Sequence, residues 1–418
     1  MLKVKLADSF LRKLYFLVMR FSVKGNLDSY ICCMLFKDVI GQLNVKKQLV
    51  YSVENKRIPH AQLFVAPKGT GALPLAIAYA QYILCSNTDG ENITGDDACN
   101  LKFGKLTHPD LHFVFPVATT DKIKSKPVSD NFLEEWRGFI LSNPYGNVLD
   151  WYNVLGIENK QGQIGVDEAE IIVKKLSLKA YEGGYKVMII WMAEKLNTAA
   201  SNKLLKLIEE PPDKTILLLI TEDEDQILNT ITSRCQQVKL FPLSENDIVN
   251  ALMERENITE NEALKIAHQA DGNWNRTIQI LHNSSNELQF EQWFITWIRT
   301  AFKAKGNAAV IEELVSWSDA IASTGREIQK SFLSYCSQFF RQALLMNYNA
   351  GELVFFEPKT ENFDLSKFAP FVHSGNILEI ENELNDAIYH IERNANAKIV
   401  LLDLSIKLTR LLHQKEAV

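Results

Sequence analysis

CxxC cysteine pairs, long apolar runs and an excess of basic charge are all missing from this sequence. Its six cysteines are scattered and form no CxxC pair, which predicts reduced thiols in the cytosol and no disulfide framework. No apolar run approaches the roughly 20 residues that a membrane-spanning helix needs. Acidic side chains outnumber basic ones, 51 to 45, so any nucleic-acid contact must come from a local patch. We therefore expect a cytoplasmic protein without a membrane partner.

What remains is an ordinary globular composition in a long chain. The 418 residues are 46% hydrophobic and 23% charged, which excludes a disordered or collagen-like protein. This length predicts roughly two to four domains with real cores.

The first 33 residues differ from the rest, with six basic and two acidic side chains. Charges interrupt their apolar stretch and no small-residue cleavage site follows, so we do not expect a signal peptide. Cys32 and Cys33 lack the small residue that would precede a lipidated cysteine. We interpret residues 1–33 as a functionally silent extension and Met34 as the natural start.

A strand, a glycine loop and a helix follow one another from Gln62 to Tyr82, which is the setting of a phosphate-binding P-loop. A working loop reads GxxxxGK[ST], in which backbone amides cradle phosphate, the lysine reaches the β and γ phosphates and the hydroxyl holds magnesium. Here alanine and leucine replace the lysine and the hydroxyl residue, so we expect no nucleotide cofactor. The degenerate loop comprises Ala66, Gly69, Gly71, Ala72 and Leu73.

A second nucleotide element is missing further along. The apolar strand predicted over 186–190 should end in a Walker B acid for magnesium, but Trp191 and Met192 stand there. Glu194 lies beyond that pair, and we interpret it as a solvated acid at a helix start.

Several strings in a specific order carry a family resemblance. The chain resembles the clamp-loader branch of the AAA+ proteins, most closely the delta prime subunits of bacterial DNA polymerase III. The resemblance spans about residues 34–285. It rests on Ile40-Gly41-Gln42, Pro59-His60-Ala61, His108-Pro109-Asp110, Tyr181 to Val187, the LLKLIEEPP run within Asn202 to Pro212, and Ser233-Arg234-Cys235. In that family, delta prime is similar to the ATP-hydrolysing gamma and tau subunits but has lost its own nucleotide site.

The resemblance implies a role for Arg234, the arginine of the SRC string. It would reach across a subunit boundary toward ATP held by the adjacent motor subunit, where a guanidinium stabilises charge on the transferring phosphate. The structural alternative is an arginine near a helix C-terminus that interacts with the helix dipole and a nearby acid. The three-residue context favours the role in trans.

Two further features have structural and functional interpretations. The segment Gly272 to Arg276 resembles the second-sensor segment of a small lid domain, but without a phosphate site we expect Arg276 to make structural contacts and Trp274 to pack in a core. An insertion near 117–160 is rich in aromatic residues with few basic ones, which favours a packed elaboration over a base-stacking platform. Its aromatic residues include Phe132, Trp136, Phe139, Tyr145, Trp151 and Tyr152.

Metal binding is formally conceivable but poorly supported. Relatives usually carry a four-cysteine zinc module before the HPD string, whereas this chain keeps only Cys85 and Cys99 there. With His108 and His112 they form a two-cysteine, two-histidine set, but the gap between the cysteines is unsuited to a compact site. We predict buried thiols and no metal.

The sequence therefore predicts a degenerate AAA+ P-loop α/β domain with a parallel sheet, a small helical lid and an all-α collar. The predicted boundaries are 34–243, 244–285 and 286–418. Helical stripes that include Ile391, Ile399 and Ile406 support the last.

The predicted function is that of a non-hydrolysing stator subunit in a DNA polymerase III clamp loader. Its partners would be gamma or tau and delta subunits and, indirectly, the sliding clamp and primed DNA. We expect the isolated chain to be catalytically inert. The alternatives are an ATP-hydrolysing gamma or tau-type motor and an ATP-independent DNA-binding scaffold.

Overall fold

A computed structural model describes most of the chain beyond the N-terminal region. The described residues are 35–85, 98–157, 160–182, 184–282, 285–305, 307, 310–354, 360 and 363–415. The predicted silent extension over 1–33, with Cys32 and Cys33, lies outside them.

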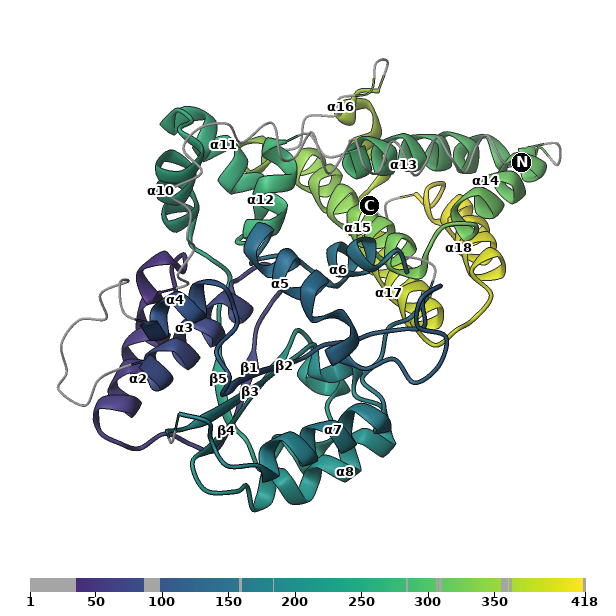
Figure 1. Ribbon diagram of the computed structural model, residues 1–418. Helices are drawn as coiled ribbons and strands as arrows, with labels where there is room; N and C mark the ends of the chain where they lie inside the picture. The colour runs from purple at the N-terminus through teal and green to yellow at the C-terminus, as the bar shows by residue number, and fades with distance from the viewer. Residues whose placement is uncertain are drawn as a thin grey trace, which may run out of the picture.

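A five-stranded parallel sheet organises the first part of the described chain, with strand order β2-β3-β4-β1-β5 (Figure 1). The strands are β1 (Ala61–Val65), β2 (Leu111–Val114), β3 (Lys186–Trp191), β4 (Thr215–Thr221) and β5 (Gln236–Lys239). In the register, Leu63 lies opposite Leu219, and Ile190 also pairs with Leu219 from the other side. The central strands are almost continuous apolar runs because helices cover both faces of a parallel sheet.

Alternate side chains of the strands enter two different cores. Leu217 and Leu219 of β4 pack toward α7 (Val166–Ser177) and α8 (Thr198–Glu209), which lie below the sheet in Figure 1. Leu218 and Ile220 face the opposite side and join the core there. That side is covered by α3 (Ala72–Cys85) and by the insertion helices α5 (Leu133–Ser142) and α6 (Val148–Leu155).

The remaining helices and 3-10 turns complete this domain. They are η1 (Phe36–Asp38), α2 (Leu43–Glu54), α4 (Ala98–Gly104), η2 (Ser129–Phe132), η3 (Ala193–Lys195), η4 (Glu224–Gln226) and α9 (Asn229–Thr232).

Three helices with their own apolar core follow the sheet domain. They are α10 (Glu245–Glu256), α11 (Glu260–Ala270) and α12 (Trp274–Leu281). Ser244 caps α10 by accepting from the backbone N–H of Asp247, and Thr259 and Glu262 form a capping box at α11. Trp274 is buried in this core, as the sequence predicted.

The C-terminal part of the described chain is wholly helical. Its elements are α13 (Ser285–Ala304), α14 (Ile311–Ala322), α15 (Arg326–Asn347), η6 (Gly351–Leu353), α16 (Leu365–Phe368), η7 (Ala369–Phe371), α17 (Ile377–Glu392) and α18 (Ala397–Leu411). The rings of Trp297 and Trp317 stack in its core with centroids 4.9 Å apart. The predicted fold class is confirmed, whereas the exact domain boundaries stay predictions.

The predicted stripe of the collar is wrong in part. Ile391 is buried, but Ile399 and Ile406 are exposed on α18. The chain leaves the helix after α17 and α18 starts afresh with Asn396 as its cap, so the helical period does not continue between them. Leu401, Leu404 and Leu408 face the core instead.

Candidate functional site

The phosphate-loop position lies between β1 and α3, as the sequence predicted, but its side chains are apolar and buried. Ala72 and Leu73 start α3 and belong to the core between this helix and the sheet. Gly69 and Gly71 have φ angles of +69° and +91°, a backbone region that favours glycine. The turn of a phosphate loop is therefore present without the lysine and hydroxyl that would hold a magnesium nucleotide.

Tyr145 of the insertion closes one side of this loop. A Cβ atom added to Gly71 would lie 2.8 Å from Cε1 of Tyr145, so the ring packs directly against the glycine. The Tyr145 hydroxyl accepts a hydrogen bond of 2.8 Å from the backbone N–H of Ile40. The insertion thus anchors an aromatic ring over the loop.

The start of α12 closes another side. The backbone N–H of Trp274 donates to the carbonyl of Gly69 at 3.0 Å, and a Cβ at Gly69 would lie 1.8 Å from Oδ1 of Asn273. Asn273 is held in place because the same oxygen caps α12 by accepting from the backbone N–H of Arg276. The cavity left at the loop has a volume of about 30 Å³.

A magnesium nucleotide does not fit this site. Pockets for small molecules have volumes of about 300–1,000 Å³, and the groups lining this one include no lysine at the loop position. The strand that should carry the Walker B acid ends in Trp191, whose ring centroid lies 5.1 Å from that of the buried Trp136. Met192 is also buried. Aromatic packing takes up the side of the site where a magnesium ligand would be needed.

The aromatic residues of the insertion are packed rather than presented for stacking on bases. Trp136, Trp151 and Tyr152 are fully buried, and the Nε1–H of Trp151 donates to the carbonyl of Pro116 at 2.9 Å. Tyr152 donates its hydroxyl to the carbonyl of Gly162. The packed interpretation made from the sequence agrees with these contacts.

The expectation for Glu194 is right about its place in the first turn of η3 but wrong about its surroundings, because this half-buried residue is not a solvated acid. Met192 adopts a φ of +57° and turns the chain, so that Oε1 of Glu194 accepts from the backbone N–H of Glu222 at 3.4 Å. The second oxygen, Oε2, is buried and has no hydrogen-bond partner among the described residues. Burial, followed by the nearby Glu222 carboxylate, raises the pKa of Glu194 to about 7.

Arg234 follows β4 and the short helix α9, and its side chain reaches the surface. Its neighbours Ile231 and Cys235 are buried in the core beneath α8, while the Arg234 side chain is 39% exposed. Its Nε donates to Oε1 of Glu209 at 2.5 Å and its Nη1 donates to the carbonyl of Thr230 at 2.8 Å. These are the contacts of the structural alternative. The exposure is what a role in trans requires, so that role stays a prediction.

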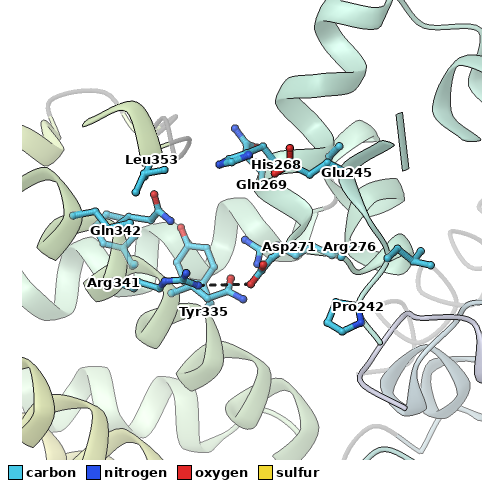
Figure 2. A pocket seen from close by; sticks show the side chains of 16 residues that line it. Pro242, Glu245, His268, Gln269, Asp271, Arg276, Tyr335, Arg341, Gln342 and Leu353 are labelled. Carbon is cyan, nitrogen blue, oxygen red and sulfur yellow. Dashed lines mark hydrogen bonds and ion pairs between the residues drawn. The ribbon is translucent and has the colours of Figure 1, made fainter. Parts of the chain in front are cut away.

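Arg276 does not line the cavity at the phosphate loop. It lines a separate cavity of about 330 Å³ between the lid helices and α15 (Figure 2). Asp271 and Arg341 form an ion pair of 3.7 Å across this cavity. The position agrees with the structural role expected for Arg276.

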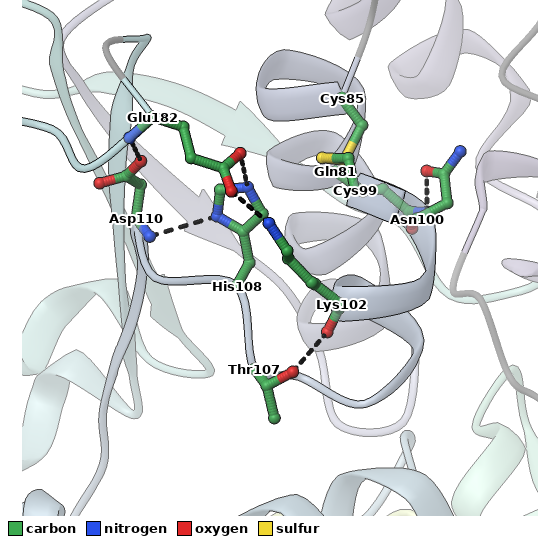
Figure 3. The surroundings of a disulfide bond; sticks show 9 residues. All are labelled: Gln81, Cys85, Cys99, Asn100, Lys102, Thr107, His108, Asp110 and Glu182. Carbon is green, nitrogen blue, oxygen red and sulfur yellow. Dashed lines mark hydrogen bonds and ion pairs between the residues drawn. A yellow bond between two sulfur atoms is a disulfide. The ribbon is translucent and has the colours of Figure 1, made fainter. Parts of the chain in front are cut away.

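The prediction of reduced thiols is wrong for one pair. Cys85 at the end of α3 and Cys99 in α4 form a disulfide with Cα atoms 5.6 Å apart (Figure 3). The sequence separation of 14 residues hid this pairing, because only the packing of α4 against the end of α3 brings the two residues together. Cys235 and Cys336 are buried free thiols.

The formal set of two cysteines and two histidines is not assembled. The ligand atoms that lie within 4.8 Å of one another belong to Cys99, His108 and Glu182. A disulfide sulfur is not the thiolate that binds metals, and Glu182 is engaged by Lys102 and by Nε2 of His108 at 3.1 Å (Figure 3). His112 lies on β2 outside this group, where burial lowers its pKa to about 4.

Among the residues that the structure describes, no helix combines the length and apolar character that crossing a bilayer requires.

The strand order, the phosphate-loop connection and the three lid helices define an AAA+ P-loop-type protein. The family described as "DNA polymerase III, delta subunit" matches residues 41–244. Over this part of its length the chain is similar to delta prime subunits of DNA polymerase III.

Relatives of known name show the same similarity. The delta prime subunit of Bacillus subtilis is 29% identical over 215 residues, which cover 51% of this chain and 52% of the relative. That of Escherichia coli K12 is 29% identical over 207 residues, 49% of each chain. The chain thus spans about half the length of these relatives. The tau subunit of Bacillus subtilis is 29% identical over 251 residues, 59% of this chain and 37% of tau.

A solved structure of a gamma subunit-related protein from Thermotoga maritima is 12% identical. It covers 88% of this chain and 100% of its own, with a TM-score of 0.37.

Proposed function

We propose that this chain is a non-hydrolysing stator subunit of a DNA polymerase III clamp loader. In this role it orients gamma or tau motor subunits and a delta subunit, and helps to open a sliding clamp and place it on primed DNA. The proposal includes a cytoplasmic location. One contrast carries it: Tyr145 and Asn273 close the chain's own phosphate loop, whereas Arg234 is half exposed.

Arg234 is the residue that acts on a neighbour in this proposal. A guanidinium carries a permanent charge and offers N–H donors in a rigid fork that matches phosphate oxygens. Placed against the γ-phosphate in an adjoining subunit, it stabilises the charge that spreads over the transferring group. The chain then contributes to ATP hydrolysis without binding ATP itself.

The test uses Arg234→Ala in a complex reconstituted with gamma or tau and delta subunits. We expect normal assembly, and a loss of about 10³-fold or more in the DNA-stimulated ATPase rate of the site that Arg234 serves. The steady-state ATPase rate of the whole complex falls only by the fraction of turnover that this site contributes. Arg57→Ala, which removes another exposed arginine, is the matched control. Wild-type turnover in the Arg234 variant would contradict the proposal.

The two rival functions predict different binding by the isolated chain. A gamma-type motor binds ATP with magnesium at micromolar concentration, which the apolar loop residues and the small cavity oppose. A DNA-binding scaffold binds DNA tightly and with a steep salt dependence. Titration with labelled ATP and with primed DNA at two salt concentrations separates these functions from the stator, for which we expect neither signal.

A further inference from the structure

The ion pair between Arg234 and Glu209 joins two rigid parts of the sheet domain. Glu209 is the last residue of α8, which ends before Pro211 and Pro212 and is anchored by the buried Ile208. The imidazole Nε2 of His60 lies 3.0 Å from the carbonyl oxygen of Ile208, within hydrogen-bonding distance. The backbone that carries the carboxylate is therefore held in place.

The backbone of Arg234 is fixed in the same manner. Its N–H donates to the carbonyl of Ile231 at 3.0 Å, and the buried Ile231 and Cys235 flank it in the chain. Only the side chain extends outward, where Glu209 meets it. Two anchored backbones thus define where the guanidinium lies.

The hydrogen bonds of the guanidinium leave one corner available. An arginine side chain has five N–H donors. Nε donates to Glu209, and Nη1 donates to the carbonyl of Thr230 and, at 3.4 Å, to the hydroxyl of Ser233. Nη2 takes part in none of the hydrogen bonds found among the described residues. Its two N–H groups are the ones left for an external anion.

The exposure of the pair argues against a mainly stabilising role. The side chains of Arg234 and Glu209 are 39% and 45% exposed, and ion pairs this exposed contribute little to stability. What the pair does accomplish is to restrict a long side chain that would otherwise sample many rotamers. Restricting a group before it meets its target is how positioning contributes to a reaction rate.

We propose that Glu209 is a positioning residue for Arg234, which orients the guanidinium so that Nη2 faces the phosphate of the neighbouring subunit. This inference rests on the proposed function in trans and adds a second residue to it. Glu210 provides a matched comparison, because it is the next residue, is also exposed, and forms no ion pair among the described residues.

The experiment measures kcat and KM for ATP in the reconstituted complex with Glu209→Ala, Glu209→Gln, Glu210→Ala and Arg234→Ala. We expect Glu209→Ala to lower the kcat of the served site about 10-fold with little change in KM, because a misplaced group weakens transition-state contacts. The carboxamide oxygen of Glu209→Gln can still accept from Nε, so this isosteric variant recovers most of the rate. Glu210→Ala behaves as the wild type.

The double variant separates positioning from a structural effect. If Glu209 acts through Arg234, adding Glu209→Ala to Arg234→Ala lowers the rate no further. Additive losses in the double variant overturn the positioning role. A wild-type or increased rate in Glu209→Ala, with Arg234→Ala impaired, also overturns it. The proposed function survives both of these results. A wild-type rate in Arg234→Ala overturns both.

Discussion

The phosphate loop and the surface around Arg234 belong to the same sheet domain but differ in accessibility: the loop is closed and the arginine is exposed. At the loop, Tyr145 and Asn273 fill the space and leave a cavity of about 30 Å³. At Arg234, a permanently charged side chain reaches the surface with its backbone anchored by buried neighbours. The comparison teaches that this chain keeps the fold of a nucleotide-binding domain but fills the nucleotide position with packed side chains. The Arg234 side chain, in contrast, stays accessible to another molecule.

The largest expected effect on stability comes from removing a buried aromatic side chain of the insertion. Trp151→Ala removes a fully buried indole whose ring centroids lie 5.0 Å from Phe115 and 5.1 Å from Trp136. We expect the free energy of unfolding to fall by about 3–5 kcal/mol, measured by urea denaturation. Tyr181→Ala, at a position 83% exposed, should change it by less than about 0.5 kcal/mol. Equal effects of the two variants would show that the insertion is not part of the core.

A smaller effect on stability, which depends on pH, is expected at Glu194. The pKa of Glu194 is raised to about 7, so between about pH 4.5 and pH 7 the folded chain keeps a proton that the unfolded chain has lost. Stability from this group therefore falls as the pH rises through that window, by on the order of 3 kcal/mol. Burial also raises the pKa of the neighbouring Glu222, which acts in the same direction.

Glu194→Gln tests this linkage because the amide stays neutral. We expect the variant to match the wild type at pH 4 and to be more stable at pH 8, with a flatter profile of unfolding free energy against pH. Glu210→Gln, at an exposed site, should leave the profile unchanged. A wild-type profile in Glu194→Gln would show that this carboxyl is solvated in the folded chain.

The smallest effect on stability is expected at the exposed Arg234. Arg234→Ala breaks a half-exposed ion pair with Glu209, so the free energy of unfolding should change by no more than about 1 kcal/mol. Thermal and urea denaturation of the isolated chain measure this change. Combined with a large loss of ATPase rate in the complex, a small change sharpens the contrast between the two regions. A loss as large as that of Trp151→Ala would make Arg234 a structural residue.

The order of elements could be predicted because its signals are local. Buried parallel strands read as short apolar runs, and the strand expected over 186–190 is observed as Lys186–Trp191. The capping box of Thr259 and Glu262 was likewise visible, since its two residues lie within one helical turn. The absence of a lysine at position 72 could be predicted from the spacing of the loop alone.

The contacts that close the loop could not be predicted from spacing. Tyr145 meets the backbone of Ile40 across a sequence separation of 105 residues, and Asn273 meets Gly69 from the lid. Cys85 and Cys99 were misjudged for the same reason, because helix packing decides whether two sulfurs meet. The turn at Met192 that directs the Glu194 carboxyl inward, with its Oε2 buried, also had no sequence signal.

The amino-acid sequence by itself determined which groups this protein can use: no lysine, hydroxyl or Walker B acid at the nucleotide position, and one arginine in a family string. Only the tertiary structure decided that Tyr145 and Asn273 occupy the loop and that Glu209 holds Arg234. The reason is physical. The identity of a side chain is carried by one residue, whereas its burial and its partners depend on which distant segments the core packs against it.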